Sequence, residues 1–169
     1  MDPAPFVYFA YGSNMSGERL RAADRAPSAE RKGSGSVAGY RLVFDKVGRD
    51  GSGKADCERT DAPLDAVHGA LFQIAGRDRQ ALDKAEGLGN GYDAVQISVR
   101  TDSGEVLALT YLATRKNSAL RPYTWYLRHV LAGARQSGLP ARYIEAIERV
   151  QAVRDTDAER EARELAIHG

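Results

Sequence analysis

The sequence predicts a single α+β domain, because alternating strand patterns fill the first two thirds of the chain and helical patterns fill the last third. The clearest strand signal is a pair of alternating runs on either side of the tight turn Asp102–Gly104. The clearest helical signals begin at Pro122. The chain has 169 residues, and a chain of about 150 residues buries roughly 70% of its unfolded surface. We therefore expect residues 1–169 to form one folding unit, with 153–169 as a charged C-terminal helix or tail.

The first strand is expected over Phe6–Tyr11, which is a short apolar and aromatic run. Turn-forming residues 12–14 end this strand, and Ser16 can cap a short helix that reaches about Ala23. Alternation of apolar and polar residues predicts the remaining strands. They are Val37–Val47, Lys54–Glu58, Val67–Ile74, Val95–Thr101 and Val106–Ala113.

One helix is expected between the strands, over Arg77–Glu86, where helix-forming residues predominate. Gly87 follows at a position where helices often end in a left-handed residue, so the helix should end at Glu86. Three further helices are expected at Pro122–Gln136, Pro140–Ala152 and Asp157–Ile167. The last of these helices is highly charged and has few apolar residues, so it should either fray or pack on a partner. A homodimer is therefore one possible state of the protein.

Composition excludes several classes of protein. Cys57 is the single cysteine, so no internal disulfide can form, and the three histidines are too scattered in sequence to build a zinc site with it. No run approaches the roughly 18 apolar residues of a membrane span, and no signal-peptide pattern is present. The 24 Lys and Arg residues nearly balance the 23 Asp and Glu residues, which argues against a general nucleic-acid binder. A cytoplasmic protein with no membrane, nucleic-acid or metal partner is expected.

The turn between the first strand and the first helix is one candidate site. It comprises Tyr11, Gly12, Ser13, Asn14 and Met15. A glycine-containing turn before a helix can aim several backbone N–H groups at one point, which suits an anion or an oxyanion. An ordinary strand-to-helix turn is the alternative, and composition alone favours it. The turn lacks the G-x-x-x-x-G-K pattern, so a nucleotide phosphate is a poor candidate ligand.

Glu86 is the second candidate, because it is the last residue of a predicted helix, where the helix dipole disfavours a carboxylate. Helical spacing places Leu82 on the same face, so the apolar side of the helix can carry the carboxylate inward. Burial and the helix dipole would both favour its protonated form, as a general acid or base requires. The alternative is a glutamate selected only for its helix propensity.

A basic and aromatic segment, Thr114–Pro140, is the third candidate. It contains no acidic residue, and its aromatic residues are expected to be core contacts. Its cations are expected to form a solvated face whose field reaches a small anionic substrate, and nucleic-acid binding through them is an alternative function. These cations are Arg115, Lys116, Arg121, Arg128 and Arg135.

Three motifs in this order resemble the γ-glutamylcyclotransferase group, also called AIG2-like. FAYGSNM resembles the group's YGSN loop, and LDKAEGLGNGY resembles its helix-ending Leu-Asp-x-x-Glu-Gly followed by Gly and Tyr. Pro122 and Tyr126 match its Pro-Ser-x-x-Tyr motif, and HGALFQI matches one of its strands. The resemblance covers about residues 6–148. Two departures, Tyr123 in place of serine and the polar stretch Asp56–Glu58, would lie in walls that contact the leaving group of the substrate.

The resemblance implies a small mixed β-barrel surrounded by helices, with no metal or organic cofactor. It implies an enzyme that cyclises a γ-glutamyl group to 5-oxoproline, with Glu86 as general acid and base. Under this interpretation the Tyr11–Met15 loop binds a substrate oxygen, and Tyr126 offers a hydroxyl to the glutamyl moiety. A related enzyme that removes a γ-glutamyl cap from a larger amine is the alternative.

Overall fold

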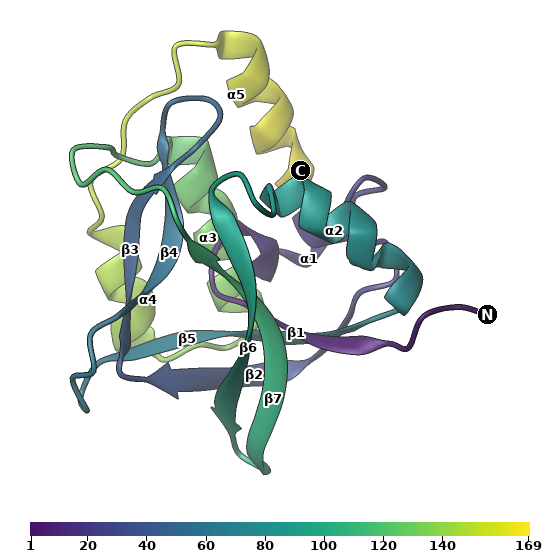
Figure 1. The fold of residues 1–169 in the computed structure, drawn as a ribbon. Coiled ribbons are helices and arrows are strands. Elements are labelled where there is room, and N and C mark those ends of the chain that lie inside the picture. Colours follow the sequence, from purple (N-terminus) through teal and green to yellow (C-terminus); the bar gives the residue numbers. More distant parts are fainter.

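A closed barrel of five strands forms the centre of the molecule (Figure 1). The computed structural model describes residues 1–169. The strand order is β1-β5-β2-β6-β7, and all neighbours are antiparallel except β1 and β7, which close the barrel in parallel. The mixed barrel expected from the resemblance is therefore confirmed. Its strands are β1 (Phe6–Ala10), β2 (Glu30–Ala38), β5 (Ala66–Ile74), β6 (Tyr92–Thr101) and β7 (Gly104–Ala113).

The predicted strand Val37–Val47 is wrong, because the chain turns sharply within it. Gly39 adopts a φ of 81°, which favours glycine, and separates β2 from β3 (Tyr40–Val47). β3 pairs with β4 (Gly53–Arg59) in a two-stranded sheet outside the barrel. Most of β2 escaped prediction because its side chains are largely exposed and its sequence, ERKGSGSVA, has little apolar alternation.

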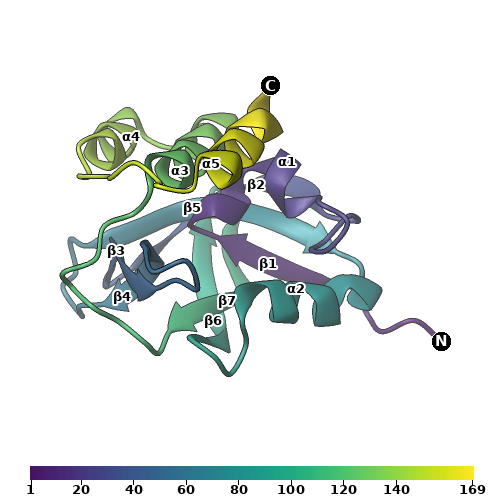
Figure 2. The ribbon, with the colours of Figure 1, turned by 90° about the horizontal axis from the view of Figure 1, so that it is seen from above.

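Helices lie on both sides of the barrel. Figure 2 shows α1, α3, α4 and α5 on one side and α2 on the other. None of these helices has the length and apolar character needed to cross a membrane. The helices are α1 (Gly17–Leu20), α2 (Arg79–Glu86), α3 (Thr124–Gln136), α4 (Ala141–Glu148) and α5 (Ala158–Leu165), with short 3₁₀ turns η1 (Ser13–Met15), η2 (Gly76–Asp78) and η3 (Ala166–His168).

The long helix α3 packs closely on the 3₁₀ turn η1 that follows β1. Gly133 permits this approach, because a Cβ atom built there would lie 2.3 Å from the Met15 Cβ and 2.4 Å from the Ser16 backbone nitrogen. Met15 is fully buried beneath this contact, and Ser16 caps α1 by accepting a hydrogen bond from the Arg19 N–H. Helix packing thus fixes the loop that the sequence singled out.

The C-terminal helix α5 is formed and packs on its own chain. Asp155, which is 3% exposed, accepts hydrogen bonds from the Trp125 indole at 2.8 Å and from the Arg160 guanidinium at 2.6 and 2.7 Å. Further along the helix, Glu164 pairs with Arg19 at 2.9 Å and with the buried ring of His129 at 2.9 Å. These polar contacts add to the packing of Leu165 of α5 against the core.

The Asp155 contacts predict an acid-dependent stability. Hydrogen bonds from Arg160 hold the pKa of the Asp155 carboxyl well below its usual range. The ionised carboxyl therefore stabilises the folded state fully above its unfolded pKa of about 4, and this stabilisation is lost as pH falls through the lower pKa of the folded state. Asp155→Asn should lower the melting temperature at pH 7, and the difference from wild type should narrow below about pH 4. Thermal unfolding across this pH range measures it. Asp102→Asn, at an exposed turn, is the control, and a difference that does not vary with pH would contradict the assignment.

Candidate active site

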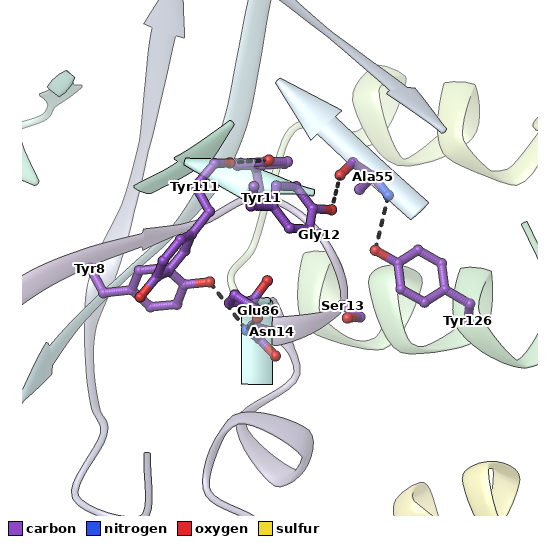
Figure 3. Close-up of a pocket in the computed structure, with 10 residues that line it drawn as sticks. Tyr8, Tyr11, Gly12, Ser13, Asn14, Ala55, Glu86, Tyr111 and Tyr126 are labelled. Atoms are coloured by element: carbon purple, nitrogen blue, oxygen red, sulfur yellow. Dashed lines mark hydrogen bonds between the residues drawn. The ribbon is translucent and has the colours of Figure 1, made fainter. Parts of the chain in front are cut away.

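An inner pocket of about 30 Å³ lies where the ends of β1, α2 and α3 meet (Figure 3). It is polar in character, because five tyrosine hydroxyl groups and one carboxylate surround it. The barrel contributes most of the tyrosines, η1 contributes backbone and one amide side chain, and α2 contributes the carboxylate. The lining residues are Tyr8, Tyr11, Gly12, Ser13, Asn14, Ala55, Glu86, Tyr92, Tyr111 and Tyr126.

Glu86 points into this pocket from the last turn of α2. The helix ends because Gly87 adopts a φ of 72°, and Leu82, one turn earlier, is fully buried against the barrel. The Glu86 side chain is 17% exposed, and its Oε1 accepts a hydrogen bond from the Asn14 side-chain amide. The inward orientation predicted from the Leu82 spacing is therefore confirmed.

Asn14 connects the carboxylate to the rest of the site. Its Nδ2 lies 3.2 Å from the Tyr8 hydroxyl, and its Oδ1 accepts a hydrogen bond from Arg25 at 3.4 Å. Arg25 also lies 3.6 Å from Glu86 Oε1. Arg25 occupies an irregular turn after α1 with no motif around it, so the sequence did not identify it. Together these groups hold the carboxylate in one orientation.

Four residues of the Tyr11–Met15 loop line the inner pocket, and Met15 does not. The Met15 N–H donates to the Gly12 carbonyl at 3.1 Å, and its side chain belongs to the core, so Met15 has no free N–H for a ligand. Its inclusion among the binding residues is wrong. The N–H groups of Gly12, Ser13 and Asn14 stand at the start of η1, where a helix provides no internal acceptor.

Tyrosines make up most of the pocket wall. The Tyr126 hydroxyl accepts a hydrogen bond from the Ala55 N–H at 3.0 Å, while the Tyr92 hydroxyl donates to the Ala55 carbonyl at 2.5 Å. The Tyr11 hydroxyl donates to the backbone carbonyl of Tyr111. Burial raises the pKa of Tyr8, Tyr11, Tyr92 and Tyr126, so these hydroxyl groups keep their protons at neutral pH. Tyr8, Tyr92 and Tyr111 were not predicted as site residues, because tyrosine in a strand is also typical of a core.

The inner pocket opens into an outer cavity of about 240 Å³, which shares Ser13, Glu86, Tyr92 and Tyr126 with it. No cation of the basic Thr114–Pro140 segment lines this cavity, although Arg115 lies close enough to act electrostatically on Lys46, which does line it. Lys116, for example, pairs with Asp56 at 2.9 Å. The cations that line the cavity are Arg19, Arg25, Lys46, Arg49, Lys54 and Arg160.

The two departures from the family motifs also lie outside both cavities. Tyr123 packs beside Trp125, and its hydroxyl donates to the Asp50 carbonyl at 3.2 Å. Asp56 is buried and accepts a hydrogen bond from the Ala113 N–H at 2.8 Å. Both residues stabilise the fold behind the site, so the expectation that they contact the leaving group is wrong.

Comparison of the chain with known proteins identifies its relatives. The sequence profile described as the AIG2-like family matches residues 66–147. The chain is 31% identical to the mouse γ-glutamylcyclotransferase over 156 residues, which cover 86% of this chain and 79% of the relative. It is 29% identical to the human γ-glutamylcyclotransferase, covering 89% of this chain and 81% of the relative.

A solved structure of a γ-glutamyl cyclotransferase superposes on nearly the whole chain. The TM-score is 0.84 at 27% identity, and the superposition covers 96% of this chain and 98% of the other. The chain therefore belongs to the γ-glutamylcyclotransferase family.

Proposed function

We propose that this protein is a γ-glutamylcyclotransferase that converts the γ-glutamyl group of a γ-glutamyl amino acid or amine to 5-oxoproline and releases the amine. The observation that carries the proposal is the Glu86 carboxylate, held by Asn14 and Arg25 in a pocket that also contains the Gly12–Asn14 backbone. The names of the mouse and human relatives support the same activity.

The reaction takes place within one substrate molecule. The α-nitrogen attacks the γ-carbonyl carbon, a C–N bond forms to close a five-membered ring, and the C–N bond to the leaving group breaks. Two protons leave the α-ammonium and two reach the leaving nitrogen, so no water is consumed. The protein has to fold the substrate into a reactive shape, move these protons and stabilise the oxyanion that develops.

Glu86 is the group that moves the protons. The α-ammonium has a pKa of about 8 and is unreactive until a base removes a proton. Glu86 accepts that proton and later delivers one to the departing nitrogen. Its contact with Asn14 fixes the carboxylate, and the partly buried site limits competition from water.

The η1 loop binds a substrate oxygen in this proposal. Gly12, Ser13 and Asn14 line the inner pocket, and their N–H groups at the start of η1 suit either the α-carboxylate or the tetrahedral oxyanion. The neutral Tyr126 hydroxyl can donate a hydrogen bond to the glutamyl moiety, since its interaction with Ala55 uses it only as an acceptor. No cofactor is required for these steps.

Tyr126→Phe should lower kcat/KM for a γ-glutamyl dipeptide by about tenfold, because one hydrogen bond to the substrate is lost. The Ala55 N–H also loses its acceptor, so a small decrease in melting temperature should accompany the kinetic effect. Steady-state kinetics and thermal unfolding measure both. Tyr143→Phe removes a hydroxyl on α4 outside the pocket and should leave kcat/KM unchanged. Equal kinetics for wild type and Tyr126→Phe would remove Tyr126 from the binding site.

The experiment that tests the proposed function is incubation with γ-glutamyl dipeptides, γ-glutamyl amines and glutathione, followed by detection of 5-oxoproline. Release of 5-oxoproline from at least one of them is the expected result. Release of free glutamate instead would indicate removal of the γ-glutamyl cap by hydrolysis. Neither product from the whole panel would refute the proposal.

A further inference from the structure

A chain of polar side chains connects the C-terminal helix to the η1 loop of the candidate site. Figure 2 shows α5 beside α3, with the C-terminus next to α1. The Arg19 Nε donates a hydrogen bond to the Ser13 Oγ at 3.1 Å, and its Nη1 donates to the Glu164 Oε2 at 2.9 Å. The Arg19 and Glu164 side chains are only 12% and 18% exposed. The chain therefore runs from α5 to the first residue of η1.

His129 of α3 holds Glu164 from the other side. Its ring is fully buried, with Nε2 at 2.9 Å from the Glu164 Oε2 and Nδ1 at 2.7 Å from the His168 Nε2. Burial lowers the pKa of His129, so the ring is neutral at neutral pH. A neutral ring that donates from Nε2 to the carboxylate must accept at Nδ1, so His168 supplies the N–H between the two rings. Both ring nitrogens of His129 then have a partner.

Ser13 is the point at which this chain reaches the substrate. It lines both the inner pocket and the outer cavity, whereas Arg19 and Glu164 line only the outer one. Because the Ser13 Oγ accepts from Arg19, its own hydrogen can be donated to the Tyr126 hydroxyl or to a substrate oxygen. An Arg19 side chain without its carboxylate partner would regain rotamer freedom, and the orientation of the Ser13 hydroxyl would be lost with it.

We infer that Glu164 and His129 are positioning residues for the cyclisation, and that through Arg19 they hold Ser13 and the start of η1 in the orientation that binds the substrate oxygen. The docked C-terminal helix is then a working part of the active site. This inference rests on the proposed function and adds residues that do not touch the glutamyl group. The alternative is that the same contacts only fasten α5 to the rest of the molecule, which would affect stability and leave the rate of the folded protein unchanged.

The same chain predicts a response to acid. The titratable and charged groups that face His129 are Glu164 of α5, His168 of η3 and Arg19 of α1. One added proton can occupy the outer nitrogen of His168, which lies 3.9 Å from Glu18, without loss of a contact. A second proton would set two N–H groups against each other across the 2.7 Å contact between the rings and break it.

The sign of this effect follows from the lowered pKa of His129. The unfolded histidine has a pKa of about 6.5, so the unfolded state takes up a proton first as pH falls. The stabilisation by the neutral ring is therefore fully present above about pH 6.5 and decreases below it. The positioning of Ser13 should weaken over the same range.

The first test compares 5-oxoproline release from γ-glutamyl-alanine at about pH 8, where half of the substrate's α-ammonium is deprotonated. Glu164→Ala should lower kcat/KM by about 10–100-fold, because Arg19 and Ser13 lose their anchor. Glu164→Gln keeps an acceptor oxygen at the same place and should recover part of this loss. Glu159→Ala, which removes an exposed carboxylate from the same helix, is the matched control and should match wild type. Thermal unfolding shows that each variant is folded at the assay temperature.

The second test uses His129→Gln, whose side-chain amide can donate to Glu164 and accept from His168 but takes up no proton near neutral pH. Between about pH 8 and about pH 5.5, kcat/KM of His129→Gln should decrease less than that of wild type. Both proteins share Glu86 and the substrate, so the ratio of their two pH profiles isolates the histidine.

The outcomes separate the inference from the function on which it rests. Unchanged kcat/KM in folded Glu164→Ala, even with a lower melting temperature, would overturn the positioning role and leave the cyclase activity standing. Identical pH profiles of wild type and His129→Gln would remove His129 from that role. No 5-oxoproline from wild-type protein would refute both the function and the inference. If Glu164→Ala does not fold, Glu164→Gln provides the same comparison.

Discussion

Glu86→Gln should abolish 5-oxoproline release while the protein stays folded. The amide cannot accept the proton of the α-ammonium, and removal of a positioned acid or base typically costs about 10²–10⁴-fold in rate. The glutamine carbonyl oxygen can still accept the Asn14 hydrogen bond, so only the charge contact with Arg25 is lost. That contact is partly exposed and should contribute about 1 kcal/mol or less. Single-turnover kinetics and thermal unfolding measure the two effects separately.

The matched control is Glu105→Gln, which removes an exposed carboxylate on β7 far from the pocket and should be fully active. Near wild-type turnover by Glu86→Gln would show that Glu86 does not move the protons. A variant that is inactive and also unfolded would be uninformative about rate, so Glu86→Asp is a useful companion. It keeps the acid and withdraws it from the pocket, and an intermediate rate is expected from it.

Gly133→Ala should damage both stability and activity, although Gly133 lies outside the pocket. The added methyl group would stand 2.3 Å from Met15 and 2.4 Å from the Ser16 nitrogen, so α3 and the η1 loop must move apart. Overpacking of this kind costs about 1–3 kcal/mol. Displacement of η1 also moves Asn14, which orients Glu86, and a misplacement of about 1 Å can cost on the order of 10²-fold in rate.

Arg128→Ala is the control for this prediction, because it changes an exposed residue on the same helix to alanine. It should keep the melting temperature and the activity of wild type. Gly133→Ala with unchanged melting temperature and unchanged kcat would show that the close contact of α3 with η1 does not hold the site in place.

The sequence predicted the parts of the fold that have local signals. The hairpin of β6 and β7, the end of α2 at Gly87 and the N-cap at Ser16 all follow from residue type and spacing, and the structure has them. It did not predict β2, because that strand is held by pairing with β5 across the barrel and has few apolar residues. The docking of α5 was also missed, since it depends partly on the ion pair of the buried Asp155 with the partly buried Arg160, which has no periodic pattern.

In the candidate site, too, the sequence identified the residues that have a local signal and missed those that only the tertiary structure brings together. Glu86 was recognisable from its helix end and its spacing from Leu82, and the η1 loop from its place between a strand and a helix. Arg25 lies in a turn and Lys46 lies in β3. Only the tertiary structure brings these two residues to the outer cavity. The cations of the Thr114–Pro140 segment do not line the cavity, because charge along the sequence does not show which way a side chain faces.

The most direct test of the account is the reaction of wild-type protein with γ-glutamyl-alanine in water labelled with heavy oxygen, followed by mass spectrometry of the products. Cyclisation consumes no water, so the account predicts unlabelled 5-oxoproline and alanine in equal amounts, and no such release by Glu86→Gln. Glutamate carrying labelled oxygen would contradict the account, because it would show that water, and not the substrate's own α-amine, attacks the γ-carbonyl.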